Sequence, residues 1–311
     1  DMDADAPAGS INLKSKRAFD RQGRRISWQA NLTANSEEFT WGKTYGPGDG
    51  QRRKIVPGVV LEYSDIFFNK KLGVILNYSN STLYSENYLT THTVNTTTTS
   101  ADLRPAVPTR VAFKDSGKFT IRESAALTTD LKLTPKLVLS LSSIYNFYEG
   151  TIRNRNLNFD AAAANTTAAG RPSVVGVDPM ISFTTSAPGG ASRAVGQNSN
   201  YVNKHTETYT LAPRLEFNSG NLSLEVKGVY STSQNLYNTT GDGLVYSAVV
   251  NGLPNIDFTA TRSGYDTADW KIRQLSGPDW TDLSNYLNPR AGGFFRRIVD
   301  ERISGQVDAT Y

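Results

Sequence analysis

The stretch ISWQANLTAN, residues 26–35, carries the pattern that decides the fold. Apolar side chains occupy every second position from Ile26 to Ala34, and polar side chains fill the positions between them. Successive side chains of a β-strand point to opposite faces, so this alternation predicts a strand with one apolar face and one polar face.

The same alternation recurs along the chain. It predicts further strands at 57–66, 72–84, 117–131, 137–149, 205–218, 221–233 and from about 302 to Tyr311. The short connections between them are 67–71, 132–136 and 218–221. The long, polar connections are 36–56, 85–115, 150–204 and 234–301. The chain is therefore predicted to be all-β, with about eight antiparallel strands in meander order.

Short and long connections in alternation, with one apolar face on every strand, are typical of a transmembrane β-barrel with short periplasmic turns and long extracellular loops. We expect the apolar face to run through Trp28, Leu61, Leu76, Leu139, Leu224 and Val307. Aromatic residues near the predicted strand ends suit a membrane interface, although strands favour such residues in any case. They are Tyr63, Phe67, Phe147, Tyr148, Tyr209, Phe217 and Tyr230.

About eight strands can be recognised, and an eight-stranded barrel has an interior that its own side chains fill. The last predicted strand has no partner in the chain that would close a larger barrel, and an open sheet edge cannot face lipid. We therefore expect an open, curved sheet that is part of a larger barrel. The first residue is the acidic Asp1, with neither the basic start nor the apolar run of a signal peptide, which suggests a processed precursor or a piece of a longer chain.

Composition limits the classes of protein and of functional site that the chain can represent. Of the 311 residues 38% are hydrophobic, and no apolar run approaches the roughly 18 residues of a membrane helix. The net charge of +4 comes from scattered Lys and Arg rather than from a basic stripe, so nucleic acid is not an expected partner. The absence of cysteine excludes thiolate metal sites and cysteine nucleophiles.

No catalytic or metal site is predicted, and no cofactor. Asp1, Asp3 and Asp5 resemble the start of a calcium loop, but Ala6 and Asn12 stand where that loop needs Gly and Glu. Neither of the two histidines has a metal-like neighbour at the right spacing, and neither a hydrolase elbow nor a phosphate loop is present. The chain is not expected to be an enzyme.

The connection 234–301 is the predicted ligand-binding segment. Exposed aromatic rings can stack on sugar rings while nearby carboxylates accept hydrogen bonds from sugar hydroxyls. The candidate residues are Tyr265, Asp266, Asp269, Trp270, Trp280 and Asp282. Residues 244–250 and 257–261 could pair as a small hairpin, and Asp279 could cap a short helix through Tyr286. The other interpretation is a loop that packs on a small core of its own.

Residues 1–20, DMDADAPAGSINLKSKRAFD, form an acidic turn, a short strand and a basic exit. They resemble the end of the plug domain of TonB-dependent outer-membrane receptors, in the subgroup whose plug ends PDMDADAxGGxxNLxTxxAFD. Asp1–Ala6, Gly9, Asn12–Leu13 and Ala18–Asp20 match, whereas Ala8 stands where the pattern often has Gly.

This resemblance implies that residues 1–25 are the C-terminal tail of a plug and its linker, and that 26–311 are the N-terminal part of the barrel. Gly9, Asn12, Lys14 and Arg17 would form the plug–barrel junction.

The resemblance also implies a function, namely energy-dependent import of a bulky nutrient across the outer membrane of a Gram-negative bacterium. Carbohydrate is the favoured nutrient and an iron chelate is the other. The expected partners are outer-membrane lipid, the nutrient, and the TonB complex, reached through an upstream segment that this sequence does not include.

The alternative is a passive porin or adhesin-type barrel without energy coupling, in which residues 1–20 would be a free tail or a ninth strand.

Overall fold

The computed structural model describes residue 19 and residues 23–44, 52–98, 100, 103–161, 173–186, 195–239, 246–253 and 255–311. This part of the chain consists of β-strands and two short 3-10 turns, η2 (Ser36–Glu38) and η3 (Leu283–Asn285), and it contains no α-helix. No helix in the same ranges is long and apolar enough to cross a membrane. The predicted junction residues Gly9, Asn12, Lys14 and Arg17 lie outside the described residues.

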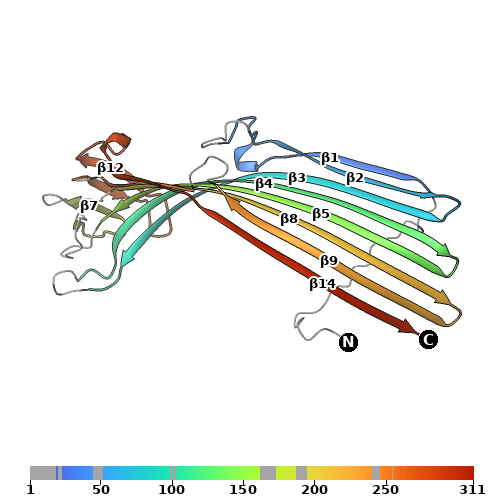
Figure 1. Ribbon diagram of the computed structural model, residues 1–311. Coiled ribbons are helices and arrows are strands. Elements are labelled where there is room, and N and C mark those ends of the chain that lie inside the picture. Colours follow the sequence, from blue (N-terminus) through green and yellow to red (C-terminus); the bar gives the residue numbers. More distant parts are fainter. Residues whose placement is uncertain are drawn as a thin grey trace.

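Eight long strands lie side by side in one antiparallel meander (Figure 1). In order across the sheet they are β1 (Arg25–Thr33), β2 (Val56–Phe67), β3 (Leu72–Asn95), β4 (Val107–Thr134), β5 (Leu137–Asp160), β8 (Val195–Ser219), β9 (Leu222–Asn238) and β14 (Phe295–Thr310). Among the described residues β1 pairs with β2 alone and β14 with β9 alone, so the sheet is open at both edges. The predictions of an all-β fold, a meander order and an open sheet are confirmed.

The strands are longer than predicted. β4 is 28 residues long, and β3, β5 and β8 have 24 or 25. Pairing continues to Asn95↔Val107 and Phe159↔Val195, well inside the stretches 85–115 and 150–204 that were predicted as loops. Those two boundaries were wrong because the backbone ladder continues after the side-chain alternation fades.

The predicted short turns are present and lie together at one end of the sheet, which we call the turn end (Figure 1). Residues 68–71, 135–136 and 220–221 make these connections. Gly220 has a φ of +59°, the left-handed conformation that glycine adopts without a steric penalty.

At the opposite end the sheet is extended and covered. β10 (Ser247–Leu253) pairs with β8 beyond the end of β9, and β13 (Leu287–Gly292) pairs with β10. A second sheet contains β6 (Ser173–Val175), β7 (Ser182–Ser186), β11 (Asp257–Thr261) and β12 (Lys271–Ser276) in the order β12-β11-β7-β6. The predicted hairpin of 244–250 with 257–261 is wrong, because β10 joins the main sheet and β11 pairs with β7 and β12.

One face of the long strands is largely apolar in five successive rows, which we call the apolar belt. From the turn end upward the apolar members of its rows are Leu137, Phe217 and Leu224; Phe67, Leu72, Leu131, Leu139, Leu215, Val226 and Val307; Val74, Leu141 and Pro213; Ile26, Tyr63, Leu76, Leu127, Leu211, Tyr230 and Ile303; and Trp28, Leu61, Tyr78, Ala125, Tyr145 and Tyr209. The polar members of these rows are Asp65, Thr129, Ser143, Thr232 and Glu301.

The belt is exposed and is not packed into a core. Trp28 is 71% exposed, Val307 67%, and Leu61 and Leu76 46% each. Most of the interface aromatics predicted from the sequence lie in or beside this belt, and Tyr148 is on the opposite face. The residues predicted for the apolar face therefore lie on one face of the sheet, and that face is exposed and largely apolar.

The opposite face, which we call the polar face, carries hydroxyl groups that bond across neighbouring strands. Thr210 and Ser231 are 3.0 Å apart, and Thr128 and Ser142 are 3.2 Å apart. Ser140 donates to Asp130 at 2.6 Å. These bonds satisfy polar groups that lie between strands.

Candidate functional site

The two sheets pack against each other at the covered end and enclose an apolar core. We call this region the distal module. Its fully buried side chains include Val111, Phe159 and Val195 from the main sheet and Phe183 and Phe258 from the second sheet. Phe159 and Phe258 meet edge to face at 5.3 Å between ring centroids, which is a favourable aromatic geometry. The segment predicted to bind ligand is part of this module.

The two predicted tryptophans belong to that core. Trp270 is 4% exposed, its ring lies 5.7 Å from Phe183, and the guanidinium of Arg262 lies 5.0 Å over it. Trp280 is half-buried, with its ring 5.6 Å from that of Phe159. In this arrangement the Trp270 ring offers no open face on which a sugar could stack.

Tyr265, Asp266 and Asp269 lie at the surface of the module. The Tyr265 hydroxyl donates to Asp178, which raises the pKa of the tyrosine. Asp269 accepts a hydrogen bond from the Ser263 backbone N–H at 3.1 Å. The bonds from Thr267 and Ser263 lower the pKa of Asp269 to about 2, so its carboxylate is already engaged within its own loop.

Asp282 caps η3 by accepting from the Ser284 backbone N–H at 2.9 Å. The predicted cap Asp279 instead accepts from the Thr281 backbone N–H, also at 2.9 Å, and starts the turn before it. The expected helix to Tyr286 is therefore only the short η3, and Asp282 begins it. Ligand binding by the six predicted residues stays a prediction, and four of them, Tyr265, Asp266, Asp269 and Asp282, are exposed.

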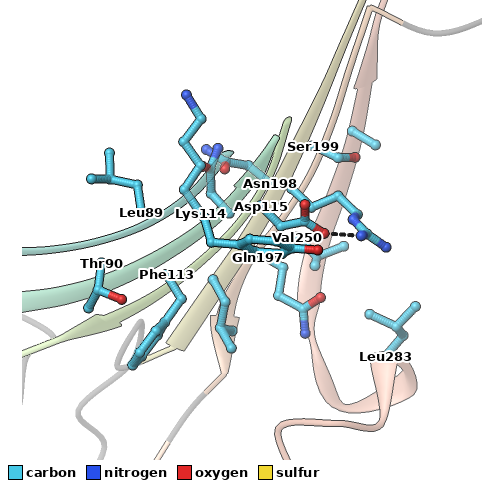
Figure 2. Close-up of a pocket in the computed structure, with 15 residues that line it drawn as sticks. Leu89, Thr90, Phe113, Lys114, Asp115, Gln197, Asn198, Ser199, Val250 and Leu283 are labelled. Atoms are coloured by element: carbon cyan, nitrogen blue, oxygen red, sulfur yellow. Dashed lines mark hydrogen bonds and ion pairs between the residues drawn. The ribbon is translucent and has the colours of Figure 1, made fainter. Parts of the chain in front are cut away.

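A pocket of about 530 Å³ opens beside the core (Figure 2), a volume within the range of small-molecule sites. Its floor is one row across the main sheet: Thr90, Phe113, Leu157, Gln197 and Val250. Figure 2 shows Phe113 and Gln197 on one side of the strands and Leu89 and Lys114 on the other. Leu283 of η3 forms part of the far wall.

Hydrogen bonds and an ion pair hold the polar groups of the pocket in place. The Gln197 amide donates to the Tyr286 hydroxyl at 2.9 Å and to the Trp280 carbonyl at 3.3 Å. Burial raises the pKa of Tyr286, so its hydroxyl stays neutral. Arg155 and Asp115 form an ion pair at the rim, drawn as a dashed line in Figure 2. The pocket therefore combines an apolar floor with oriented hydrogen-bonding groups.

Sequence reasoning did not single out these pocket residues, because they lie in stretches predicted to be loops. The sequence nevertheless contains a pattern that indicates strands in these stretches. Val111 and Phe113, Leu157 and Phe159, and Val195 resume the period-2 pattern after a polar interruption.

The described residues contain no group of three or more His, Cys, Asp or Glu side chains placed to hold a metal ion. Comparisons of the chain with models of protein families, with curated proteins and with solved structures give no match.

Proposed function

We propose that this chain forms part of the wall of a transport β-barrel in the outer membrane of a Gram-negative bacterium. Its class would be the TonB-dependent receptors, which import bulky nutrients, and carbohydrate is the favoured cargo. The observation that carries the proposal is the exposed apolar belt.

The belt has the dimensions of a bilayer. Its five rows cover Leu137 to Tyr145 of β5, which is about 30 Å of strand at roughly 3.4 Å per residue. Once the strands tilt, this matches the apolar band of about 25 Å on outer-membrane barrels. A soluble protein rarely exposes contiguous apolar surface on this scale.

The arrangement of connections supports the same assignment. Two- to four-residue turns lie at one end, and at the other end the strands continue into the pocket-bearing distal module. In outer-membrane barrels short turns face the periplasm and long connections face outward. We therefore assign the turn end to the periplasm and the distal module to the cell exterior.

The open edges at β1 and β14 support a larger barrel. Unpaired strand edges cannot face lipid, because their backbone groups would lack hydrogen-bond partners. Further strands, outside the described residues, would close the wall. The TonB-dependent assignment itself depends on the plug-like motif of residues 1–20.

Lipid quenching of single labels tests the membrane assignment. The chain has no cysteine, so Leu139→Cys, Asn77→Cys and Tyr265→Cys each give one defined labelling site in it. In the complete protein, reconstituted with spin-labelled lipids, a fluorophore at Leu139 in the belt should be quenched. Labels at Asn77 on the polar face and at Tyr265 in the distal module should not. Equal quenching at the three sites would refute the assignment.

Liposome swelling separates the plugged receptor from the passive alternative. Vesicles containing the complete protein should not swell in arabinose, because a plug closes the lumen. Rapid swelling would support the passive porin instead.

A further inference from the structure

The polar face carries a row of positive charges. Arg122 of β4, Lys204 of β8 and Arg296 of β14 point to this face, and no ion pair involves them among the described residues. Their partners are aromatic rings, which hold a cation without cancelling its charge.

These residues form a cation–aromatic ladder across five strands: Arg122, Tyr148, Lys204, Tyr237 and Arg296. Arg122 and Lys204 each lie 5.8 Å from the Tyr148 ring centroid. Lys204 lies 5.8 Å from the Tyr237 ring and Arg296 lies 4.5 Å from it. Each ring therefore has two cations beside it.

Gly150 makes room for the ladder. It lies two residues beyond Tyr148 on the same face, and a Cβ at this position would come within 2.6 Å of the Tyr148 hydroxyl. The glycine lets the ring lie along the strand toward Lys204, which pairs with Gly150.

Nearer the turn end of the same face, two positively charged side chains are paired with carboxylates. Arg214 is bound by Glu216 and Glu225, and Lys227 is bound by Glu225 at 3.1 Å and Asp308 at 3.4 Å. The charges of Arg214 and Lys227 are thus paired with carboxylates, in contrast to the cations of the ladder.

A groove of about 470 Å³ lies against the ladder. Arg122 and Tyr148 line it together with hydroxyl and amide side chains of Ser79, Ser81, Ser124, Asn146, Thr206 and Thr208. Glu123 also borders the groove. Its side chain and that of Asn80 alternate with the groove side chains and belong to the opposite face, where Glu123 accepts a hydrogen bond from Asn80 at 3.0 Å. The groove therefore presents one cation of the ladder, a tyrosine ring and many neutral hydrogen-bonding groups.

We infer that the ladder and groove bind an anionic, polyhydroxylated ligand, and that the transported nutrient is an acidic oligosaccharide bearing carboxylate or sulfate groups. The cations would contact the acid groups, the tyrosine rings would stack on sugar rings, and the hydroxyls would bond to sugar hydroxyls. This inference rests on the proposed function, because it takes the polar face to line the transport path.

The test compares binding of tetragalacturonate with that of its neutral methyl ester to the complete protein in detergent micelles. The wild type should bind the acid at least about tenfold more tightly, as expected for one or more charge-assisted hydrogen bonds. The preference should weaken as salt is added. Equal affinity for acid and ester would overturn the inference.

The variant Arg122→Gln/Lys204→Gln/Arg296→Gln should lose the preference for the acid. The matched control is Arg302→Gln, which removes a positive charge from the same face of β14. Asp300 neutralises that charge at 3.3 Å, so the control should keep the preference for the acid. If the triple variant fails to insert, Arg296→Gln alone, at the exposed edge strand, should still reduce it. An unchanged preference in an inserted variant would overturn the inference.

The lipid-quenching measurement keeps the two proposals apart. A wild type that inserts but binds acid and ester equally refutes the ligand class and leaves the membrane assignment intact. A wild type that does not insert refutes the membrane assignment first.

Discussion

Lys54 shows how a single buried cation fixes a connection to the sheet. Its side chain is 5% exposed and contacts Glu86, which is 2% exposed, at 3.2 Å. Nearby, Arg52 bonds to Glu149 at 2.7 Å. These contacts hold the connection between β1 and β2 against the strands just above the apolar belt.

We predict that Lys54→Met loosens this connection. It removes the Lys54 cation from beside the buried Glu86 carboxylate, and loss of one partner of a buried ion pair costs about 3–5 kcal/mol. Limited proteolysis should cut residues 34–55 sooner than in the wild type. The double variant Lys54→Met/Glu86→Gln removes both charges and should be cut more slowly than the single variant. Equal rates would contradict the buried-pair explanation.

Asp269 gives a prediction about pH. Its pKa is lowered to about 2, first by the bond from Thr267 and then by those from Ser263. A carboxylate with a lowered pKa in the folded state stabilises the fold above its ordinary pKa of about 3.9 and loses that contribution as the pH falls toward about 2.

Asp269→Asn should therefore reduce protection of the Ser263 amide from hydrogen exchange at pH 6, compared with the wild type at the same pH. This difference should shrink as the pH falls through about 2, where half of the wild-type carboxyls are protonated. A difference that does not depend on pH would show that the charge of Asp269 is unimportant.

At the scale of strands, the sequence pattern located the strand termini at the turn end better than those at the covered end. Alternation marked the belt-forming parts of all eight long strands. Above the belt the same face carries Asn80, Glu123 and Glu207, so the apolar periodicity stops there. Backbone hydrogen bonds do not depend on side-chain polarity, and the strands therefore continue for 10 or more residues through this interruption of the apolar pattern.

The position of each row in the belt determines the cost of placing a charge there. Leu141 lies in the third of five rows and Leu139 in the second. Leu141→Arg should reduce the free energy of folding into lipid by about 2–4 kcal/mol, and Leu139→Arg by a smaller amount.

Urea titration in liposomes would measure both. Asn77→Arg, at an exposed position on the polar face, serves as the control and should have little effect. If the control costs as much as Leu141→Arg, the belt does not face lipid.

At the scale of the whole molecule, the distal module has a core separate from the belt. Phe258→Ala removes a fully buried ring from that core and should cost about 3–5 kcal/mol. The fluorescence of Trp270, which packs in the same core, should shift to longer wavelength as water enters. Lipid quenching at Leu139 should be unchanged, whereas loss of both signals would show one cooperative unit.

The candidate site was the least predictable part. Trp270 follows Asp269 in a polar sequence, which suggested exposure, yet its packing partner Phe183 is 87 residues away in the chain. The cation–aromatic ladder likewise joins residues from five strands, and only the register of the sheet brings them together. Local pattern carries no information on such pairings.

The unbroken length of the central strands has a mechanical consequence. β4 runs for 28 residues, about 90 Å of contour at roughly 3.3 Å per residue, from the turn end into the core of the distal module. No loop interrupts it, and its two register shifts lie near its ends, at 108–110 and 132–134. A change of a few degrees in strand tilt at the turn end would displace the distal module by several ångströms, because the strand is long. The wall and the pocket beside it would then move as one body.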